Sequence, residues 1–398
     1  MTNHFSVGMT KATELTKAGK LADATALIQL LLTNKAPDTA NVPDAAIMPD
    51  AAIVPDGTAI EGAYTRLGEA EPVHAAPPKH NLHNAKAPRT SLREALRKIA
   101  AGGMPANLRA FKTDAPLATG AKFITLTHCN AQGQRDYKLY TPANQPLAAM
   151  PLIVMLHGCT QSPDDFAAGT GMNALAEKHG FLVAFPAQPS GANANKCWNW
   201  FRAEDQVRDR GEPALIAGLT RDILRDYPVD PARVYVAGLS AGGAAAAIMG
   251  AAYPDLFSAV GVHSGLAVGA ATDIPQAFSA MRSGSSGTVL NKTVPTIVIH
   301  GMADTTVHPR NGDAIIAQSL RAFGGLKSAE SKGTSNGGRS YRQKRYTDRN
   351  GRAMFEHWEI DGAGHAWAGG FAAGSFTDPR GPSASEEMVR FFLGHAKT

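Results

Sequence analysis

The pattern of apolar and polar positions changes near residue 120 and predicts one large folded domain beyond it. From there on, short apolar runs alternate with stretches in which apolar side chains recur at helical spacing. Strands are expected at residues 123–127, 137–140, 152–156, 182–185, 234–236, 259–262, 296–299 and 355–360. Helices are expected between them at residues 165–178, 214–226, 241–252, 313–323 and 384–394. This alternation predicts an α/β fold, in which helices cover both faces of a mostly parallel sheet.

The residues before this domain have a different pattern. Residues 9–33 carry apolar side chains near helical spacing, so we expect residues 1–35 to form a short helical segment. This segment either packs on the main domain or serves as a docking segment for a partner. A six-residue repeat with regular prolines then begins at Pro43, and proline blocks both helix and central strand. Residues 36–119 are therefore expected to be a largely disordered linker, with one short helix after the capping pattern at Ser91, and residues 120–398 to be the main domain.

Charge argues against a nucleic-acid partner. The chain has a net charge of +5. Residues 36–74 carry seven acids and one base, whereas residues 75–113 carry eight bases and one acid, so the two stretches nearly cancel. Phe111 is the one aromatic side chain among the lysines and arginines of the basic stretch, whereas single-stranded nucleic-acid sites use several aromatic side chains on which successive bases stack.

The sequence also allows predictions of the cellular location of the protein and of its need for a metal or cofactor. We see neither an apolar signal segment in residues 1–19 nor an apolar run of membrane-spanning length, so we expect a cytoplasmic protein, with secretion by another route left open. The three cysteines, Cys129, Cys159 and Cys197, lack zinc-ligand spacing. No metal and no cofactor are expected.

One serine stands in a sequence context typical of a nucleophile. The strand at 234–236 leads into Gly238-Leu239-Ser240-Ala241-Gly242, and a helix rich in small residues follows. A strand, a tight turn and a helix are the context that supports a G-x-S-x-G motif, because glycines flanking the serine leave room for the turn. Ser240 is therefore the candidate nucleophile, and the alternative is a serine that only caps the helix.

A base and an orienting carboxylate follow Ser240 in the order that an α/β-hydrolase needs. Asp304 comes just after the strand at 296–299, and His365 lies in a glycine-rich loop after the strand at 355–360. Asp313 is the weaker carboxylate candidate because it lies inside a predicted helix, and Asp361 is too close to His365 along the loop. Three further histidines are assigned structural or surface roles: His300, His308 and His357.

Two backbone N–H groups should bind the negative oxygen that forms during attack on an ester. The first is expected from Ala241, directly after the nucleophile. The second is expected from Cys159, in the loop after the strand at 152–156, through its backbone and not its thiol. We interpret His157 as a residue that locks this loop.

Together these motifs resemble those of poly(3-hydroxybutyrate) depolymerase-type esterases, which are related to feruloyl and acetylxylan esterases. The resemblance covers about residues 120–395. It is carried by four segments: Leu156-His157-Gly158-Cys159-Thr160-Gln161, Cys197-Trp198-Asn199-Trp200, Gly238-Leu239-Ser240-Ala241-Gly242-Gly243 and Gly364-His365-Ala366-Trp367-Ala368-Gly369-Gly370.

The resemblance implies an α/β-hydrolase fold and a catalytic triad of Ser240, Asp304 and His365. It also suggests that Cys159 and Cys197 pair in a disulfide; two buried free thiols are the alternative, and Cys129 stays free in either case. Four residues are candidates for substrate binding, although the tryptophans could instead belong to the core: Trp198, Trp200, Trp367 and His263. The long stretch 266–292 could cover the site as a lid or form a plain loop.

These features predict a serine esterase that hydrolyses short polyhydroxyalkanoate chains or related oligoesters. A feruloyl or acetylxylan esterase is the alternative within the same class, and an amidase of related fold is more remote. From a different class, the chain could be a non-catalytic protein that binds polymer granules. The complete order of serine, aspartate and histidine argues against that last hypothesis.

Overall fold

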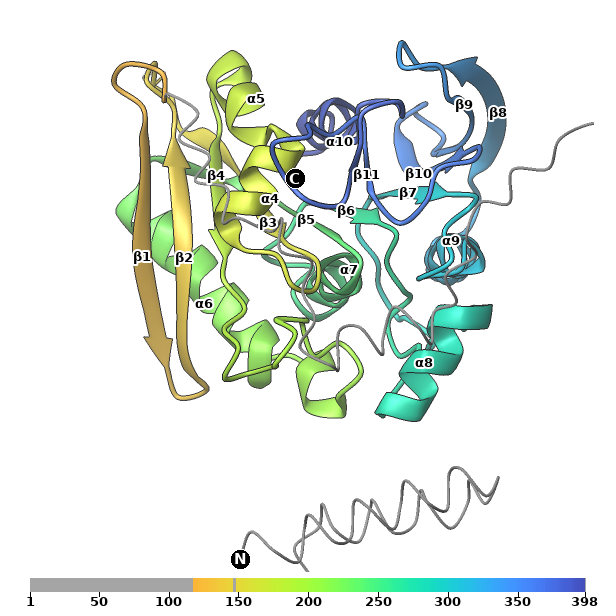
Figure 1. Ribbon diagram of the computed structural model, residues 1–398, viewed down its shortest axis with the longest axis horizontal. Helices are drawn as coiled ribbons and strands as arrows, with labels where there is room; N and C mark the ends of the chain where they lie inside the picture. The colour runs from red at the N-terminus through yellow and green to blue at the C-terminus, as the bar shows by residue number, and fades with distance from the viewer. Residues whose placement is uncertain (1–116, 146–147, 398) are drawn as a thin grey trace, which may run out of the picture. The chain divides into compact units, whose positions relative to one another are not determined.

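The computed structural model describes residues 117–145 and 148–397 (Figure 1). The helical segment expected at residues 1–35 and nearly all of the linker expected at residues 36–119 lie outside these residues. Within them, ten strands form a single sheet in the order β1-β2-β4-β3-β5-β6-β7-β10-β9-β8. The strands are β1 Lys122–Asn130, β2 Gly133–Thr141, β3 Met150–Leu156, β4 Leu182–Pro186, β5 Val229–Leu239, β6 Ala259–His263, β7 Thr296–Gly301, β8 Lys327–Thr334, β9 Ser340–Thr347 and β10 Ala353–Ile360.

The centre of the sheet is parallel and its edges are antiparallel. Strands β4, β3, β5, β6, β7 and β10 run parallel to one another, while the β1-β2 hairpin pairs antiparallel with β4 and the β9-β8 pair antiparallel with β10. Every residue of β3, β4, β6 and β7 is buried. Continuous apolar runs of this kind are what strands covered on both faces require. The predicted fold class is thus confirmed.

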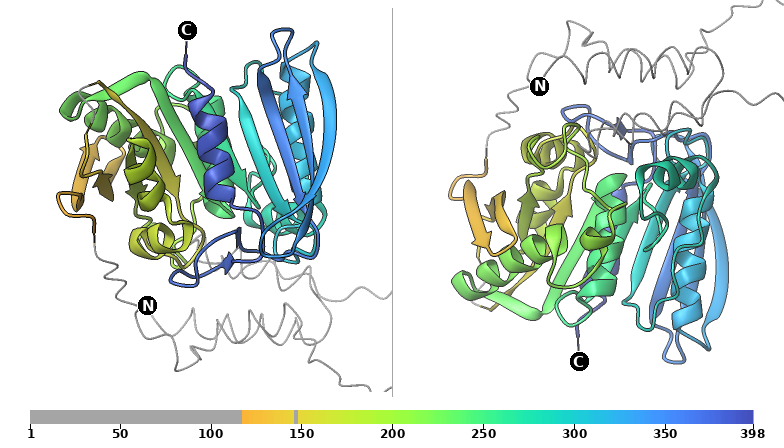
Figure 2. Two further views of the ribbon diagram at one scale, coloured as in Figure 1. Left: turned by 90° about the horizontal axis from the view of Figure 1, so that it is seen from above. Right: turned by 90° about the horizontal axis from the view of Figure 1, so that it is seen from below.

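Helices cover both faces of the sheet (Figure 2). Side chains of α4, α5 and α10 form a core on one face, and those of α6, α7, α8 and α9 form a core on the other. Along β3, Leu152 and Val154 enter one core while Ile153 and Met155 enter the other, because successive side chains of a strand alternate. The helices are α4 Pro163–Thr170, α5 Met172–His179, α6 Gly211–Asp226, α7 Ala241–Ala252, α8 Ile274–Ser283, α9 Arg310–Ala322 and α10 Ala384–Leu393, with a short 3-10 helix η1 at Ala203–Gln206.

Several elements differ from the sequence-based expectation. The single helix expected at residues 165–178 is two helices, because Gly171 between them has φ 63° and ends α4 with a left-handed cap. Strands β8 and β9 were not predicted, since most of their side chains are exposed and polar. The stretch 266–292, expected as a lid or a loop, contains α8. Two short strands, β11 Trp367–Ala368 and β12 Thr377–Asp378, form a second small sheet.

Within the described residues, no helix combines the length and the apolar character needed to cross a membrane.

Candidate active site

Ser240 occupies the sharp turn between β5 and α7. Its backbone has φ 59° and ψ −120°, a strained conformation for a residue other than glycine. A Cβ atom on Gly238 would lie 2.3 Å from the backbone of Gly242, and one on Gly242 would lie 2.1 Å from the carbonyl oxygen of Leu156. The glycines are therefore required by close backbone approach, as the motif predicted, and they hold Ser240 at the carboxyl end of the sheet.

Asp304 and His365 meet at the carboxyl edge of the same sheet. Asp304 follows β7 and His365 follows β10, and these two strands are parallel neighbours with Ile360 opposite Gly301. Parallel pairing brings their carboxyl ends to the same edge, where His365 Nδ1 lies 2.7 Å from Asp304 Oδ2. The structure thus joins two residues that are 61 positions apart in the sequence.

The carboxylate of Asp304 is held in its ionised form. Its other oxygen, Oδ1, accepts hydrogen bonds from the backbone N–H groups of Thr306 and Val307, both at 2.9 Å. Burial raises the pKa of Asp304, but interactions with His300 and His365 and the Val307 N–H outweigh burial and hold that pKa well below its usual range. A charged Asp304 can accept the Nδ1 proton of His365, which leaves the opposite ring nitrogen, Nε2, free to act as a base.

Ser240 Oγ and His365 Nε2 make no hydrogen bonds with any of the residues that the structure describes. A nucleophile and its base often approach closely only when substrate binds. Ser240 is largely buried, whereas the side chain of His365 keeps 13% of its surface exposed. The imidazole of His365 is therefore partly accessible to solvent, whereas Asp304 behind it is not.

Two N–H groups near Ser240 have no hydrogen-bond acceptor among the described residues. One is that of Ala241, the first residue of α7, because the first N–H groups of a helix have no partner within it. The other is that of Cys159. The loop of Cys159 lies against the turn, since a Cβ atom on Gly242 would be 2.5 Å from the His157 carbonyl oxygen. These are the two donors predicted from the sequence.

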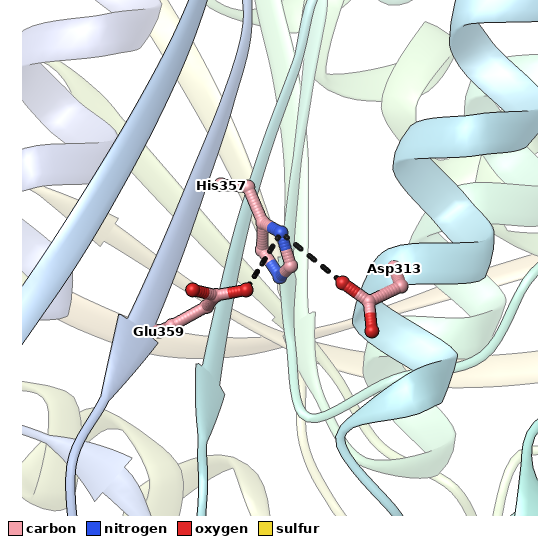
Figure 3. Close-up of side chains that lie close together, drawn as sticks. All are labelled: Asp313, His357 and Glu359. Carbon is pink, nitrogen blue, oxygen red and sulfur yellow. Dashed lines mark ion pairs between the residues drawn. The ribbon is translucent and has the colours of Figure 1, made fainter. Parts of the chain in front are cut away.

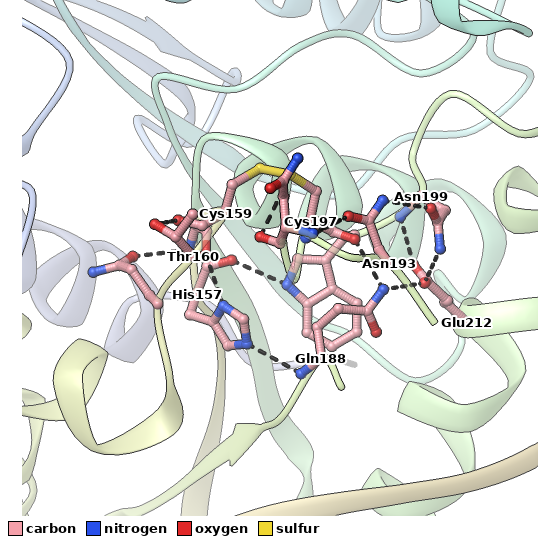
Figure 4. Close-up of a disulfide and its surroundings, with 12 residues drawn as sticks. His157, Cys159, Thr160, Gln188, Asn193, Cys197, Asn199 and Glu212 are labelled. Atoms are coloured by element: carbon pink, nitrogen blue, oxygen red, sulfur yellow. Dashed lines mark hydrogen bonds between the residues drawn. A yellow bond between two sulfur atoms is a disulfide. The ribbon is translucent and has the colours of Figure 1, made fainter. Parts of the chain in front are cut away.

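The Cys159 loop is tied to the segment around Trp198 by a disulfide between Cys159 and Cys197 (Figure 4). The Trp198 indole N–H also donates to the His157 carbonyl oxygen at 3.0 Å. Cys129, in contrast, is free and exposed. The pairing suggested by the resemblance is thus present in the structure.

His157 locks this loop from inside, as predicted. Its Nδ1–H donates to the Gly158 carbonyl oxygen at 2.8 Å, and its Nε2 accepts from the Gln188 N–H at 3.1 Å. These two bonds fit a neutral ring, and burial lowers the pKa of His157 to about 4. Gln161, which the sequence-based argument left without a role, also holds the loop because its Oε1 accepts from the Gly158 N–H at 2.9 Å.

Comparison with known proteins identifies the family. The model of the family described as "Esterase PHB depolymerase" matches residues 135–341, just over half of the chain. The chain belongs to this family. The match includes Cys159, Cys197, Ser240 and Asp304, whereas His365 lies beyond its end.

Curated relatives of this esterase-family chain include polyester depolymerases, acetylxylan esterases and feruloyl esterases. Poly(3-hydroxyalkanoate) depolymerase C of Paucimonas lemoignei is 36% identical over 242 residues, which cover 57% of each chain. Poly(3-hydroxybutyrate) depolymerase of Ralstonia pickettii is 29% identical over 253 residues, or 58% of this chain and 51% of the relative. Probable acetylxylan esterase A of Aspergillus clavatus is 31% identical over 212 residues, or 47% and 66%. The chain thus spans just over half the length of the two depolymerases.

A solved structure supports the fold. Acetyl xylan esterase from Aspergillus awamori superposes with a TM-score of 0.54 at 20% identity, covering 69% of this chain and 99% of the other. This likeness concerns the arrangement of strands and helices. The esterase-family domain therefore has the α/β-hydrolase fold that the sequence predicted.

The four predicted substrate-binding side chains lie in the core, which corrects that expectation. Trp198 donates to His157, and Trp367 donates its indole N–H to Ser385 Oγ at 3.0 Å. An indole N–H that is satisfied inside the protein is typical of a core tryptophan. The exposed fractions are Trp198 0%, Trp200 6%, Trp367 1% and His263 0%.

A separate cluster of ionisable side chains lies between β10 and α9 (Figure 3). His357 Nδ1, on β10, is 3.8 Å from an oxygen of Asp313 and 3.9 Å from an oxygen of Glu359. Asp313, the alternative carboxylate considered for the triad, therefore faces His357, whereas Asp304 faces His365. Glu359 is already paired with Lys344 at 3.1 Å, so we interpret the cluster as an ion-pair network.

Proposed function

We propose that this chain is a serine esterase in which Ser240 is the nucleophile, His365 the base and Asp304 the residue that orients the base. The observation that carries the proposal is the position of Ser240. It lies on a strained turn next to two unpartnered N–H groups, on an edge of the sheet where a charged Asp304 holds His365. This combination is what acyl transfer to a serine requires.

The reaction follows from this geometry in two halves. His365 Nε2 takes the proton of Ser240 Oγ as that oxygen bonds to the ester carbonyl carbon, and the Cys159 and Ala241 N–H groups stabilise the negative carbonyl oxygen. The carbon–oxygen bond to the alcohol then breaks, and His365 returns the proton to the leaving alcohol. Water repeats the sequence on the acyl-serine and releases the acid.

For the substrate, we propose short polyhydroxyalkanoate chains or related oligoesters. The two depolymerase names among the relatives support this class. Two exposed apolar side chains also support it, because they could contact the apolar parts of such a chain. Met302 lies two residues before Asp304, and the backbone carbonyl oxygen of Phe376 accepts from the backbone N–H of Trp367, two residues after His365. Contact with the surface of polymer granules belongs to the same proposal.

A carbohydrate esterase is the second candidate, and the acetylxylan and feruloyl esterases among the relatives favour it. Both candidates use the same triad and differ only in the acyl group and alcohol that bind. Comparing turnover of hydroxybutyrate oligomers, acetylated xylan oligomers and feruloylated sugars separates them. A preference for either sugar ester would contradict the oligoester proposal.

The chemistry itself is tested with Ser240→Ala on a p-nitrophenyl ester of a short acid. Loss of the nucleophile should lower kcat by at least about 10⁴-fold, because only binding and the N–H donors remain. Circular dichroism would verify that the variant is folded. A folded variant with most of the wild-type rate would show that Ser240 is not the nucleophile.

A further inference from the structure

A buried carboxylate that the proposed reaction does not use lies behind the Cys159 loop. Glu212, in the first turn of α6, is 7% exposed and accepts three hydrogen bonds (Figure 4). Its Oε1 accepts from Gln188 Nε2 at 2.5 Å and from Asn199 Nδ2 at 2.7 Å, and its Oε2 accepts from the Asn199 N–H at 2.8 Å. A carboxylate is rarely buried to this extent unless its partners compensate for the lost water.

The charge of Glu212 is balanced inside the protein. Arg135, which is 3% exposed, donates to Gln188 Oε1 at 2.5 Å, so one glutamine connects the guanidinium to the carboxylate. Burial and the neighbouring Asp205 raise the pKa of Glu212, while the donors of Asn199 and Gln188 oppose that change. All three donors point to the two carboxylate oxygens, and this arrangement is one that an ionised carboxylate satisfies.

The segment that Glu212 holds is the one that carries the disulfide partner of Cys159. Gln188 Nε2 donates to the Cys197 carbonyl oxygen at 2.9 Å as well as to Glu212. Glu212 therefore binds Asn199 directly and connects to Cys197 through Gln188, so it is linked to the residues on both sides of Trp198. Trp198 in turn donates to the His157 carbonyl oxygen, and Cys197 is bonded to Cys159. Both connections reach the short stretch of backbone that ends in the Cys159 N–H.

We propose that Glu212 is a positioning residue that sets the direction of the Cys159 N–H, acting through Asn199, Cys197 and Trp198. This inference rests on the proposed function, because the N–H matters only if it binds the negative oxygen of the intermediate. Hydrogen-bond catalysis of this kind depends on direction and distance, and displacement by about 1 Å can lower a rate by about 10²-fold. A residue that does not touch substrate can therefore still change the rate.

Replacing Glu212 with Gln tests this role with almost no change in volume. The side-chain amide of Gln has an NH2 donor in place of one of the two acceptor oxygens of Glu212. This NH2 group would face an N–H donor of Asn199 or of Gln188, so at least one of the three hydrogen bonds is lost. The matched control is Glu356→Gln. Glu356 is a fully buried carboxylate on β10 that accepts from Gln343, Trp358 and two arginines, and none of its hydrogen bonds within the described residues reaches the Cys159 loop.

The measurement compares an ester with the corresponding thionoester, in which sulfur replaces the carbonyl oxygen. Sulfur is larger and a weaker acceptor, so the ratio of the two rates reports on the N–H donors and not on the amount of folded enzyme. For Glu212→Gln we expect kcat on the ester to fall by about 10- to 100-fold with KM within about threefold, and the ester-to-thionoester ratio to fall with it. Glu356→Gln should keep the wild-type ratio.

A second variant keeps the inference testable if Glu212→Gln does not fold. Trp198→Phe retains an aromatic ring and removes the N–H that holds the His157 carbonyl oxygen, so it should lower the same ratio. Wild-type ratios in the folded variants, or an equal fall in Glu356→Gln, would overturn the positioning role alone. A wild-type enzyme without Ser240-dependent turnover would overturn the proposed function, and this role with it.

Discussion

His263 makes the stability of this domain depend on pH through one fully buried imidazole. Its Nε2 accepts the Ala368 N–H at 3.0 Å, its Nδ1 lies 3.1 Å from Ser264 Oγ, and its ring stacks on Trp367. A proton on Nε2 would place one N–H against another. Burial, together with His300 and His365, lowers the pKa of His263 to about 3.

The sign of the effect follows from which state binds the proton. In the unfolded chain the pKa of a histidine is about 6.5, whereas the pKa of His263 in the folded protein is lower. Below about pH 6.5 the unfolded state therefore binds a proton that the folded state does not bind. The stabilisation is complete above about pH 6.5 and is lost as the pH falls, at about 1.4 kcal/mol per unit, until the folded pKa is reached. From this histidine alone, the free energy of unfolding should be about 2 kcal/mol lower at pH 5 than at neutral pH.

The assay is urea unfolding of the wild type and of His263→Gln, followed by tryptophan fluorescence at about pH 7.5 and pH 5. Glutamine keeps an acceptor for the Ala368 N–H but cannot titrate. The variant should be less stable at the higher pH, because packing is lost, yet it should lose about 2 kcal/mol less than the wild type on acidification. Replacement of the exposed His179 by Gln is the control. Equal losses in the wild type and His263→Gln would refute the reasoning.

Three further predictions concern the site and its loop. Asp304→Asn removes the charge that orients His365 and should lower kcat by about 10⁴-fold with little change in KM, measured on a p-nitrophenyl ester; a drop below tenfold would contradict that role. Cys197→Ser opens a disulfide whose cysteines are 38 residues apart, so loop entropy predicts a loss of about 4 kcal/mol in urea unfolding, and an unchanged midpoint would count against it. Gly242→Ala would place its Cβ 2.1 Å from the Leu156 carbonyl oxygen, so we expect no folded protein, and native circular dichroism with wild-type turnover would disprove the requirement for glycine.

Much of the proposed reaction centre could be predicted from local sequence. The glycines around Ser240, the apolar strands and the order of Ser240, Asp304 and His365 are all visible along the chain. They are visible because a turn needs particular residues within a few positions, and because parallel strands bring their carboxyl ends to one edge whatever their separation in sequence. The strands β8 and β9 escaped prediction because their exposed polar side chains carry little periodic signal.

The roles of the tryptophans, in contrast, were decided by tertiary structure. A tryptophan in a loop can face either substrate or core, and the indole N–H of Trp367 reaches Ser385, 18 positions away, inside the protein. The proposed role of Glu212 was likewise decided by tertiary structure, because this residue belongs to none of the motifs identified in the sequence. Its partners Gln188 and Asn199 come from other segments, so the hydrogen bonds that give the carboxylate a role exist only after the chain has folded. The sequence thus determined the residues of the proposed triad and their order, while long-range packing determined which buried groups hold the proposed oxyanion donors in place.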